Sequence, residues 1–261
     1  MAAVLGDEPL TLVDTVAGVH RHRAGIHRRD ILVLHARPPD TSVLVDEAEM
    51  LVRLDGAAPA PRLLASGRGD AGDEWLVVGL TAAAEPASSG HHGLDTSAVV
   101  GQLAGALRHV HRTDTTAVEA TRHLDRSPAR LHARAAAKVA AGEVTRAVDG
   151  PFAGRLPEEL LAATEAVVRR SSRGGEQVVV HGSPTLSELW LAPEAPPVLT
   201  GWAAGGLGDR HLDLAVAALD VAQVFGPALV GPFLEAYGTD AIDTTRLDAF
   251  QMLVHLDGGG R

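Results

Sequence analysis

The sequence predicts an α+β protein with a bilobal fold, in which an antiparallel N-lobe sheet precedes a mostly helical C-lobe. Short segments that alternate β-branched or apolar residues with polar ones fill the first third of the chain. Apolar residues at helical spacing dominate the remainder, and a small, polar stretch separates the two patterns. We therefore expect an N-lobe over residues 1–81, a linker over 82–93 and a helical C-lobe over 94–261.

Strand character is clearest in four N-lobe segments, at residues 15–23, 31–35, 61–65 and 75–80. A hairpin turn is expected at Ala24-Gly25, between the first two segments, because glycine tolerates turn conformations. The His-Arg-His-Arg run at residues 20–23 is interpreted as the solvated face of a strand.

One helix is expected within the N-lobe, from a cap at Thr41 or Ser42 to about Leu54. The Asp55-Gly56 pair that follows is typical of a helix end. Residues at helical spacing define the expected buried side: Val43, Val45, Ala48, Leu51 and Leu54.

The C-lobe pattern predicts a helix from a cap at Asp95 or Thr96 to about His111. Its buried side would carry Val99, Leu103, Ala106, Leu107 and Val110. Further helices are expected over residues 128–144, 157–170, 211–225, 232–237 and 244–256. Short buried strands are expected at residues 178–180, 189–191 and 198–200.

The composition argues against several classes of protein. A hydrophobic fraction of 46% permits a sizeable core, and a formal net charge of −10 argues against a nucleic-acid partner. The absence of cysteine excludes disulfides and thiolate metal sites. No apolar run reaches the roughly 20 residues of a membrane helix, and the first ten residues lack signal-peptide features. We expect a cytoplasmic protein without membrane association.

Two C-lobe segments carry distinctive motifs, VVVHGSPTLSELWL at residues 178–191 and PVLTGWAAGGLGDRHLDLAVA at 197–217. In this order they resemble the catalytic and metal-binding segments of the aminoglycoside phosphotransferase family. DEAEMLVRLDG, ALRHVHRTD and FGPALVGPFLEAYG are similar to further family segments. The resemblance covers nearly the whole chain and is closest to the aminoglycoside 3′-phosphotransferase branch. It implies a bilobal, protein-kinase-like fold with a five-stranded N-lobe sheet.

The resemblance also implies that the catalytic motifs are degenerate. In the family an Asp acts near the attacking hydroxyl, and an Asn and a second Asp hold Mg²⁺. The matching positions here are Ser183, Glu188 and Gly201. A hydroxyl at 183 cannot accept a proton as a carboxylate does, and glycine offers no metal ligand. Glu188 is either a rewired base or metal ligand, or an exposed loop carboxylate.

The remaining positions of the family include both altered and retained residues. The Lys–Glu pair that orients the nucleotide phosphates in the family matches His35, with Arg37 as an alternative, and Glu47. Histidine is a weaker cation than lysine at neutral pH. Other matching positions brace loops by hydrogen bonds in the family: His181, Gly182, Asp209, Arg210 and Asp213.

The substrate side implied by the resemblance is altered too. Aminoglycosides are polycations, and the family binds them with carboxylates. Asp220 remains at one such position, although it could equally be a helix-surface residue. Gln223 takes the neighbouring acidic place, and His255 with Leu256 takes the C-terminal acidic positions.

No metal site is expected from the histidines. His91 and His92 are adjacent, and His109 and His111 are two apart, spacings that do not converge on a helix. All four are interpreted as surface imidazoles.

These observations leave three hypotheses of function. The first is a catalytically impaired, pseudokinase-like member that binds a small molecule or a protein partner in the cleft between the lobes. The alternative is an active phosphotransferase that uses ATP and Mg²⁺ on an aminoglycoside or another hydroxylated small molecule. The third is a structural or interaction role in a complex. Under the first hypothesis no cofactor is required.

Overall fold

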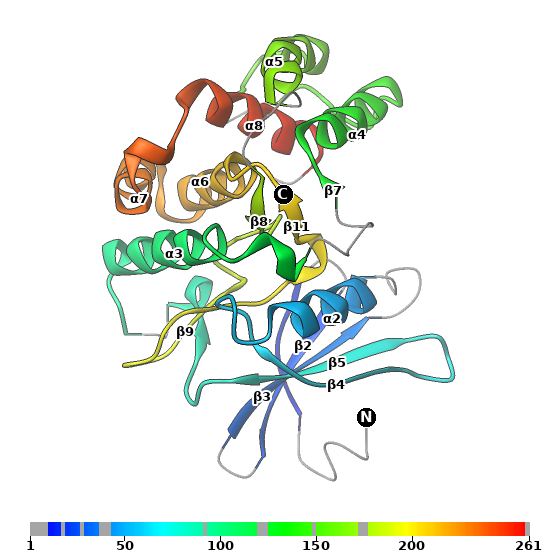
Figure 1. Cartoon of the computed structure of the whole chain (residues 1–261), viewed down its shortest axis with the longest axis vertical. Coiled ribbons are helices and arrows are strands. Elements are labelled where there is room, and N and C mark those ends of the chain that lie inside the picture. The colour runs from blue at the N-terminus through cyan, green and yellow to red at the C-terminus, as the bar shows by residue number, and fades with distance from the viewer. Residues whose placement is uncertain are drawn as a thin grey trace. The chain divides into compact units, whose positions relative to one another are not determined.

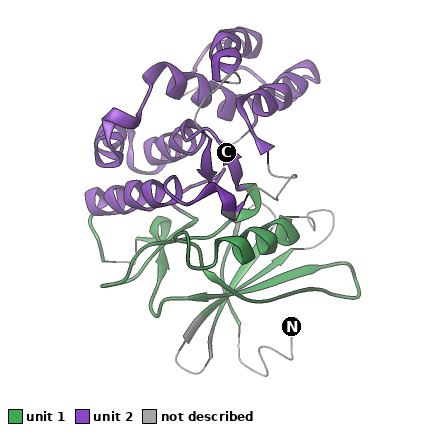
Figure 2. Ribbon diagram, viewed as in Figure 1, with its two compact units in different colours: residues 1–95, 187–204 green, residues 96–186, 205–261 purple. Residues whose placement is uncertain are grey.

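The computed structural model describes residues 10–16, 19–26, 29–36, 43–90, 93–118, 125–147, 150–171 and 177–258. The chain divides into two compact units, shown in different colours in Figure 2. Unit 1 contains residues 1–95 and 187–204, and unit 2 contains residues 96–186 and 205–261. Unit 1 is therefore assembled from two segments that lie far apart in the sequence.

A five-stranded antiparallel sheet forms the larger part of unit 1 (Figure 1). Its spatial order is β1-β2-β3-β5-β4, and the strands are β1 (Thr11–Val16), β2 (Val19–Ile26), β3 (Arg29–Ala36), β4 (Arg62–Arg68) and β5 (Glu74–Leu80). The predicted turn at Ala24-Gly25 is wrong, because both residues continue β2 and pair with Ile31 and Asp30 of β3. The single strand predicted over residues 15–23 is also wrong, because its described residues are divided between β1 and β2, which pair with each other.

Helix α2 (Val43–Leu54) packs on β3, β4 and β5. Its buried residues are Leu44, Glu47, Met50, Leu51 and Leu54. Val45, which was expected to be buried, is 51% exposed. The buried side is rotated relative to the expected one because it includes a carboxylate, Glu47, that apolar periodicity cannot identify. The expected caps at residues 41 and 42 lie outside the described residues.

A small second sheet completes unit 1 and uses both chain segments. It has the order β10-β9-β6, from β6 (Glu85–Pro86), β9 (Leu189–Leu191) and β10 (Val198–Leu199). The segment expected to be a linker therefore includes a strand, followed by the short helix η1 (Ala87–Ser89). All three tryptophans of the chain belong to unit 1: Trp75 on β5, Trp190 on β9 and Trp202 in the short helix η3 (Trp202–Ala204).

Unit 2 is mainly helical. Its helices are α3 (Thr96–Val110), α4 (Pro128–Ala140), α5 (Pro157–Ser171), α6 (His211–Phe225), α7 (Val230–Tyr237) and α8 (Thr244–Leu256). In Figure 1, α4, α5 and α8 form one group and α3 lies beside α7. The short helices are η2 (Thr115–Ala117), η4 (Pro227–Leu229) and η5 (Thr239–Ala241).

A three-stranded sheet of order β7-β11-β8 accompanies these helices, from β7 (Asp125–Arg126), β8 (Val178–Val180) and β11 (Gly206–Gly208). The expected buried residues of α3 are all confirmed. Across the described ranges, no helix combines the length and the apolar character that crossing a membrane requires.

Candidate functional site

Glu188, the residue before β9, lies in a buried network of charged groups in unit 1. The residue is only 8% exposed. Its Oε2 accepts a hydrogen bond from the Thr200 hydroxyl at 2.5 Å and another from Nη1 of Arg21 at 3.0 Å. The interpretation of Glu188 as an exposed loop carboxylate is therefore wrong. Its negative charge is compensated inside the protein.

Gly201 leaves room for this carboxylate. A Cβ on Gly201 would lie 2.7 Å from Cδ of Glu188, too close for a real side chain. The residue has a φ of +76°, a left-handed conformation that favours glycine. Its N–H donates to Oε1 of Glu47 at 2.9 Å. The two glutamates thus approach the same stretch of backbone, and any side chain at 201 would displace Glu188.

Arg21 of β2 is the cation of this network, and it is 1% exposed. One edge of the guanidinium, Nε and Nη2, binds both oxygens of Asp14, with an Nε–Oδ1 distance of 2.5 Å. The other edge donates from Nη1 to Glu188 and, at 3.0 Å, to the carbonyl of Ser187. Burial opposes the charge, but the hydrogen bonds of Asp14 and the charge of Glu188 raise the pKa of Arg21.

The interpretation of residues 20–23 as a solvated strand face is therefore wrong for Arg21. Strand alternation places neighbouring residues on opposite faces of a sheet. The register pairs His20 with His35 and Arg21 with Leu34, so the arginine faces away from these histidines. Period-two alternation along the run was the one signal that could have separated Arg21 from His20 and His22.

The side chain of Glu47 has a strongly raised pKa. Burial and the negative charge of Glu188 raise the pKa of Glu47 to about 7, although backbone N–H groups and Arg21 act in the opposite direction. A carboxyl group with such a pKa carries a proton for part of the time at neutral pH. Protonation of Glu47 therefore weakens the repulsion between Glu47 and Glu188.

The expected pair between His35 and Glu47 is not formed. Nε2 of His35 lies 2.9 Å from Oδ2 of Asp73, on the sheet face opposite Arg21. Among the described residues, Arg21 of β2 is the cation whose charge acts to lower the pKa of Glu47. The alternative residue, Arg37, lies outside the described residues.

Unit 2 contains the braced turn that precedes Ser183. Asp213 of α6 is fully buried and accepts hydrogen bonds from the backbone N–H groups of His181 and Gly182, both at 2.7 Å. It also accepts from Nε2 of His111 at 3.0 Å. The bracing role implied for Asp213 is confirmed, whereas the interpretation of His111 as a surface imidazole is wrong.

Ser183 itself is exposed, and its backbone N–H lies 3.3 Å from Nδ1 of His181. It belongs to unit 2, whereas Glu188 and Gly201 belong to unit 1. That these three residues face one site stays a prediction.

The residues expected on the substrate side lie in unit 2. Asp220 accepts a hydrogen bond from the N–H of Leu186 at 2.7 Å, and burial raises its pKa. Gln223 is exposed on the same helix. His255 lies against Phe152, with ring centroids 5.2 Å apart, and burial lowers its pKa. Their role in binding a substrate stays a prediction.

The C-terminal region retains one carboxylate that the sequence reasoning missed. Asp257 follows α8 and is paired with Arg134 and Lys138 of α4, the latter at 3.0 Å. Leu256, the neighbouring position, is fully buried. The basic side chains of α4 therefore neutralise the acid at this end of the chain.

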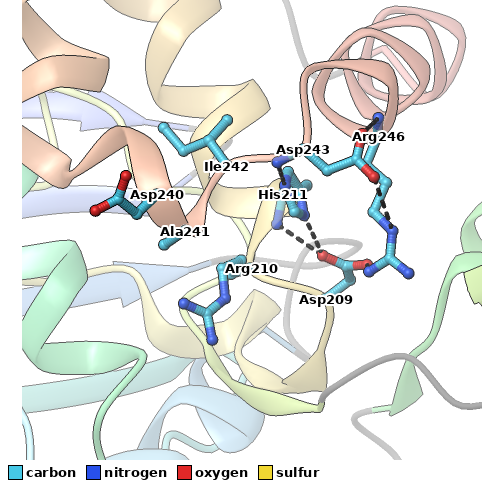
Figure 3. Close-up of a pocket in the computed structure, with 8 residues that line it drawn as sticks. All are labelled: Asp209, Arg210, His211, Asp240, Ala241, Ile242, Asp243 and Arg246. Atoms are coloured by element: carbon cyan, nitrogen blue, oxygen red, sulfur yellow. Dashed lines mark hydrogen bonds and ion pairs between the residues drawn. The ribbon is translucent and has the colours of Figure 1, made fainter.

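A polar pocket of about 380 Å³ lies where α6 and α8 begin (Figure 3). Oδ1 of Asp209 lies 2.6 Å from Nδ1 of His211, and its Oδ2 lies 3.1 Å from Nη1 of Arg246. Nε2 of His211 accepts from the N–H of Asp243, so the ring proton is on Nδ1. Burial opposes the negative charge of Asp209, but the hydrogen bonds and charge of His211 and the charge of Arg246 lower its pKa. Asp209 and His211 therefore connect the start of α6 to the start of α8.

The site residues of unit 1 do not fit a bound Mg²⁺. Magnesium requires several oxygen ligands at octahedral positions. Gly201 supplies none, and the carboxylate of Glu188 is already bound to a guanidinium. Among the residues that the structure describes, no group of three or more histidine, aspartate or glutamate side chains is arranged to hold a metal ion.

Comparison with known proteins identifies the class of this chain. The family model described as "Phosphotransferase enzyme family" matches residues 21–250, so the chain belongs to that family. An aminoglycoside 3′-phosphotransferase of Streptomyces fradiae is 31% identical over 231 residues, which are 83% of this chain and 81% of the relative. The chain is thus an aminoglycoside phosphotransferase-like protein of the 3′ branch.

Solved structures show the fold. The crystal structure of an aminoglycoside-3′-phosphotransferase of type VIII superposes with a TM-score of 0.70 and 28% identity, covering 97% of this chain and 95% of that one. The aminoglycoside phosphotransferase APH(3″)-Id from Streptomyces rimosus gives a TM-score of 0.73 at 20% identity, covering 98% and 95%. The expected protein-kinase-like fold, with an antiparallel N-terminal sheet and a mostly helical C-terminal part, is confirmed.

Proposed function

We propose that this chain is a catalytically impaired, pseudokinase-like member of the family that binds a small molecule or a protein partner and does not transfer phosphate. One observation carries the proposal. The carboxylate of Glu188 is buried, bound to Arg21 and Thr200, and packed against Gly201. The position best able to replace a lost metal ligand is therefore already used for an internal ion pair.

The chemistry of phosphoryl transfer explains why this matters. The reaction depends on positioning and on neutralising the negative charge of the triphosphate, to which Mg²⁺ contributes. Ser183 provides a hydroxyl where the family resemblance implies a carboxylate, and Gly201 provides no ligand. Losing both groups should reduce the rate by orders of magnitude.

The substrate side supports the same proposal. A polycationic aminoglycoside needs uncompensated carboxylates, but Gln223 and His255 are not acidic. The nearby Asp257 is neutralised by Arg134 and Lys138. Asp220 alone remains of the acidic positions that the resemblance implies.

The test is transfer of radiolabelled γ-phosphate from ATP to kanamycin-type aminoglycosides and to other hydroxylated antibiotics. We expect no transfer above the rate without protein, with the Streptomyces fradiae relative as the positive control. Millimolar MgATP should also change the melting temperature little, because a ligand stabilises a protein only when it exceeds its Kd.

The second candidate is an active phosphotransferase with a rewired site. The identity of 31% to a relative named as an aminoglycoside 3′-phosphotransferase supports it. Robust turnover that disappears in a Glu188→Gln variant would establish this candidate and refute the first. A cytoplasmic location and the absence of nucleic-acid partners remain predictions from composition.

A further inference from the structure

Three histidines of unit 1 lie on the face of the five-stranded sheet opposite to the face that carries Arg21. His20 and His22 are alternate residues of β2, so they share this face, and His20 pairs with His35 of β3. The ring centroids of His20 and His22 are 6.5 Å apart. We call the side chains of His20, His22 and His35 the histidine face.

The three imidazoles differ in their partners. Nδ1 of His20 lies 3.0 Å from the hydroxyl oxygen of Thr15, and Nε2 of His35 lies 2.9 Å from Oδ2 of Asp73. Among the residues that the structure describes, no carboxylate lies within ion-pair distance of His22. An imidazolium at position 35 would therefore have a counter-ion, whereas one at position 22 would have none there.

Apolar side chains surround the middle of the histidine face. Leu12 of β1 and Val33 of β3 are the register partners of His22. Val33 belongs to a buried cluster on this side of the sheet. The other members of the cluster are Ala24, Ile31 and Val77, and Ala65 and Trp75 pack against it. His22 therefore adjoins a region without water, which is unfavourable for an imidazolium.

The other charged groups described in and around the sheet lie away from the histidine face. Arg21 is paired with Asp14 and Glu188 on the opposite face. Glu47 of α2 belongs to the same side, since its charge acts on Arg21. Arg62 of β4 lies three strands away from β2 and carries a charge of the same sign as an imidazolium. None of these groups can neutralise protonated histidines.

We propose that the histidine face is an acid-sensitive element of unit 1, which weakens the pairing of β2 with β1 and β3 when its imidazoles are protonated. Like charges on directly opposite residues of a sheet destabilise the pair of strands. His20 and His35 occupy such positions, and His22 lies beside His20 against the buried cluster. The Asp73 carboxylate can compensate only one of the three positive charges.

The direction of the effect follows from His22. Burial lowers the pKa of His22, and the charges of His20 and His35 lower it further. Between this lowered value and the ordinary value of 6.5, the folded state binds fewer protons than the unfolded state. The contribution of His22 to stability is therefore complete above pH 6.5 and is lost as the pH falls below it. The raised pKa of Glu47 acts in the opposite direction.

The experiment compares thermal unfolding of the full chain at pH 7.5 and at pH 5.5, in wild type and in His22→Gln. The comparison between proteins cancels the contribution of Glu47, which is the same in both. We expect acidification to lower the melting temperature of wild type by about 2–4 °C more than that of His22→Gln. His109→Gln is the matched control, because His109 is exposed on α3 in unit 2, and it should respond as wild type does.

A second variant should change the pH response in the other direction. Asp73→Asn removes the carboxylate that pairs with His35, so acidification should lower its melting temperature by more than that of wild type. A general loss of stability would lower the melting temperature at both pH values and leave the difference between them unchanged.

Nuclear magnetic resonance tests the inference in wild type, without any substitution. The His22 ring should titrate at a lower pH than the exposed His109 ring, and amide exchange in β2, corrected for its intrinsic pH dependence, should accelerate on acidification more than exchange in α6. Equal pH responses of wild type and His22→Gln would overturn the inference, and so would a His22 ring that titrates at or above the pH of His109. Phosphate transfer by wild type would refute the proposed function and leave this inference standing.

Discussion

Glu47 connects the protonation of a single side chain to the stability of unit 1. It is buried on α2, near Glu188, and its pKa lies at about 7 instead of its usual 4.5. A raised acid pKa means that the folded state binds more protons than the unfolded state between these two values. The free energy of unfolding therefore decreases as pH rises through this window and is constant above it.

A Glu47→Gln variant should lose this dependence. Between pH 4.5 and 8 its stability relative to wild type should increase by on the order of 3 kcal/mol, because glutamine has no proton to release. Urea unfolding at several pH values measures the difference. Glu49→Gln, on the exposed side of the same helix, is the control. A difference between Glu47→Gln and wild type that does not change with pH would contradict the assignment.

The residue types at the candidate site could be read from the sequence, but their partners could not. The match to family motifs identified Ser183, Glu188 and Gly201 as altered positions. Arg21 is separated from Glu188 by 167 residues, and alternation along the charged run at 20–23 separates two faces without saying which of them is buried. Long-range pairing of this kind requires the fold, because buried charges are defined by their neighbours and not by their local pattern.

At the scale of elements, the turn that joins β10 to η3 depends on the absence of a side chain. Gly201 is constrained both by a positive φ and by the carboxylate of Glu188. The first constraint comes from the backbone conformation of Gly201, and the second comes from the side chain of Glu188. Double-mutant cycles can separate the two.

Gly201→Ala should therefore be more destabilising in wild type than in a Glu188→Ala background. The backbone conformation alone costs about 1–2 kcal/mol, and the clash should add a coupling energy of about 1–3 kcal/mol. Denaturant unfolding of the two single variants and the double variant measures it. Gly56→Ala isolates the backbone term, since φ is +73° there and no atom lies within 4 Å of the new Cβ. A coupling near zero would mean that Glu188 moves aside freely.

The elements show where sequence patterns succeed and where they stop. Helices α6 and α8 begin and end where they were predicted. Asp243 caps the start of α8 by accepting from the N–H of Arg246, and Gly226 follows the end of α6. The buried side of α2 was predicted less well, since it includes Glu47 in the place of an apolar residue. Periodicity describes apolar burial only, and a buried carboxylate that binds backbone N–H groups lies outside its reach.

At the scale of the whole molecule, unit 1 cannot be made from a continuous piece of chain. Residues 187–204 supply β9, which pairs with β6, and η3, which packs on α2. They also supply the carboxylate that neutralises Arg21. The first 95 residues alone would therefore expose apolar surface and deprive the buried Arg21 of Glu188 and the Ser187 carbonyl.

A fragment of residues 1–95 should be largely unfolded, whereas the same fragment joined to residues 187–204 by a flexible Gly/Ser linker should fold. Circular dichroism and hydrogen exchange measure the difference. A fusion that carries a scrambled version of residues 187–204 controls for added length. Equal protection of the fragment with and without the authentic segment would show that the sheet and α2 are sufficient.

The distribution of the tryptophans allows intrinsic fluorescence to report on one of the two units separately. Trp75, Trp190 and Trp202 lie in unit 1, and the single tyrosine, Tyr237, lies in unit 2. Tryptophan emission therefore follows the melting of unit 1 alone, while the far-ultraviolet helical signal comes mostly from unit 2. Coincident curves would mean that both units unfold as one cooperative body, and separated curves would reveal a half-folded state without any added dye.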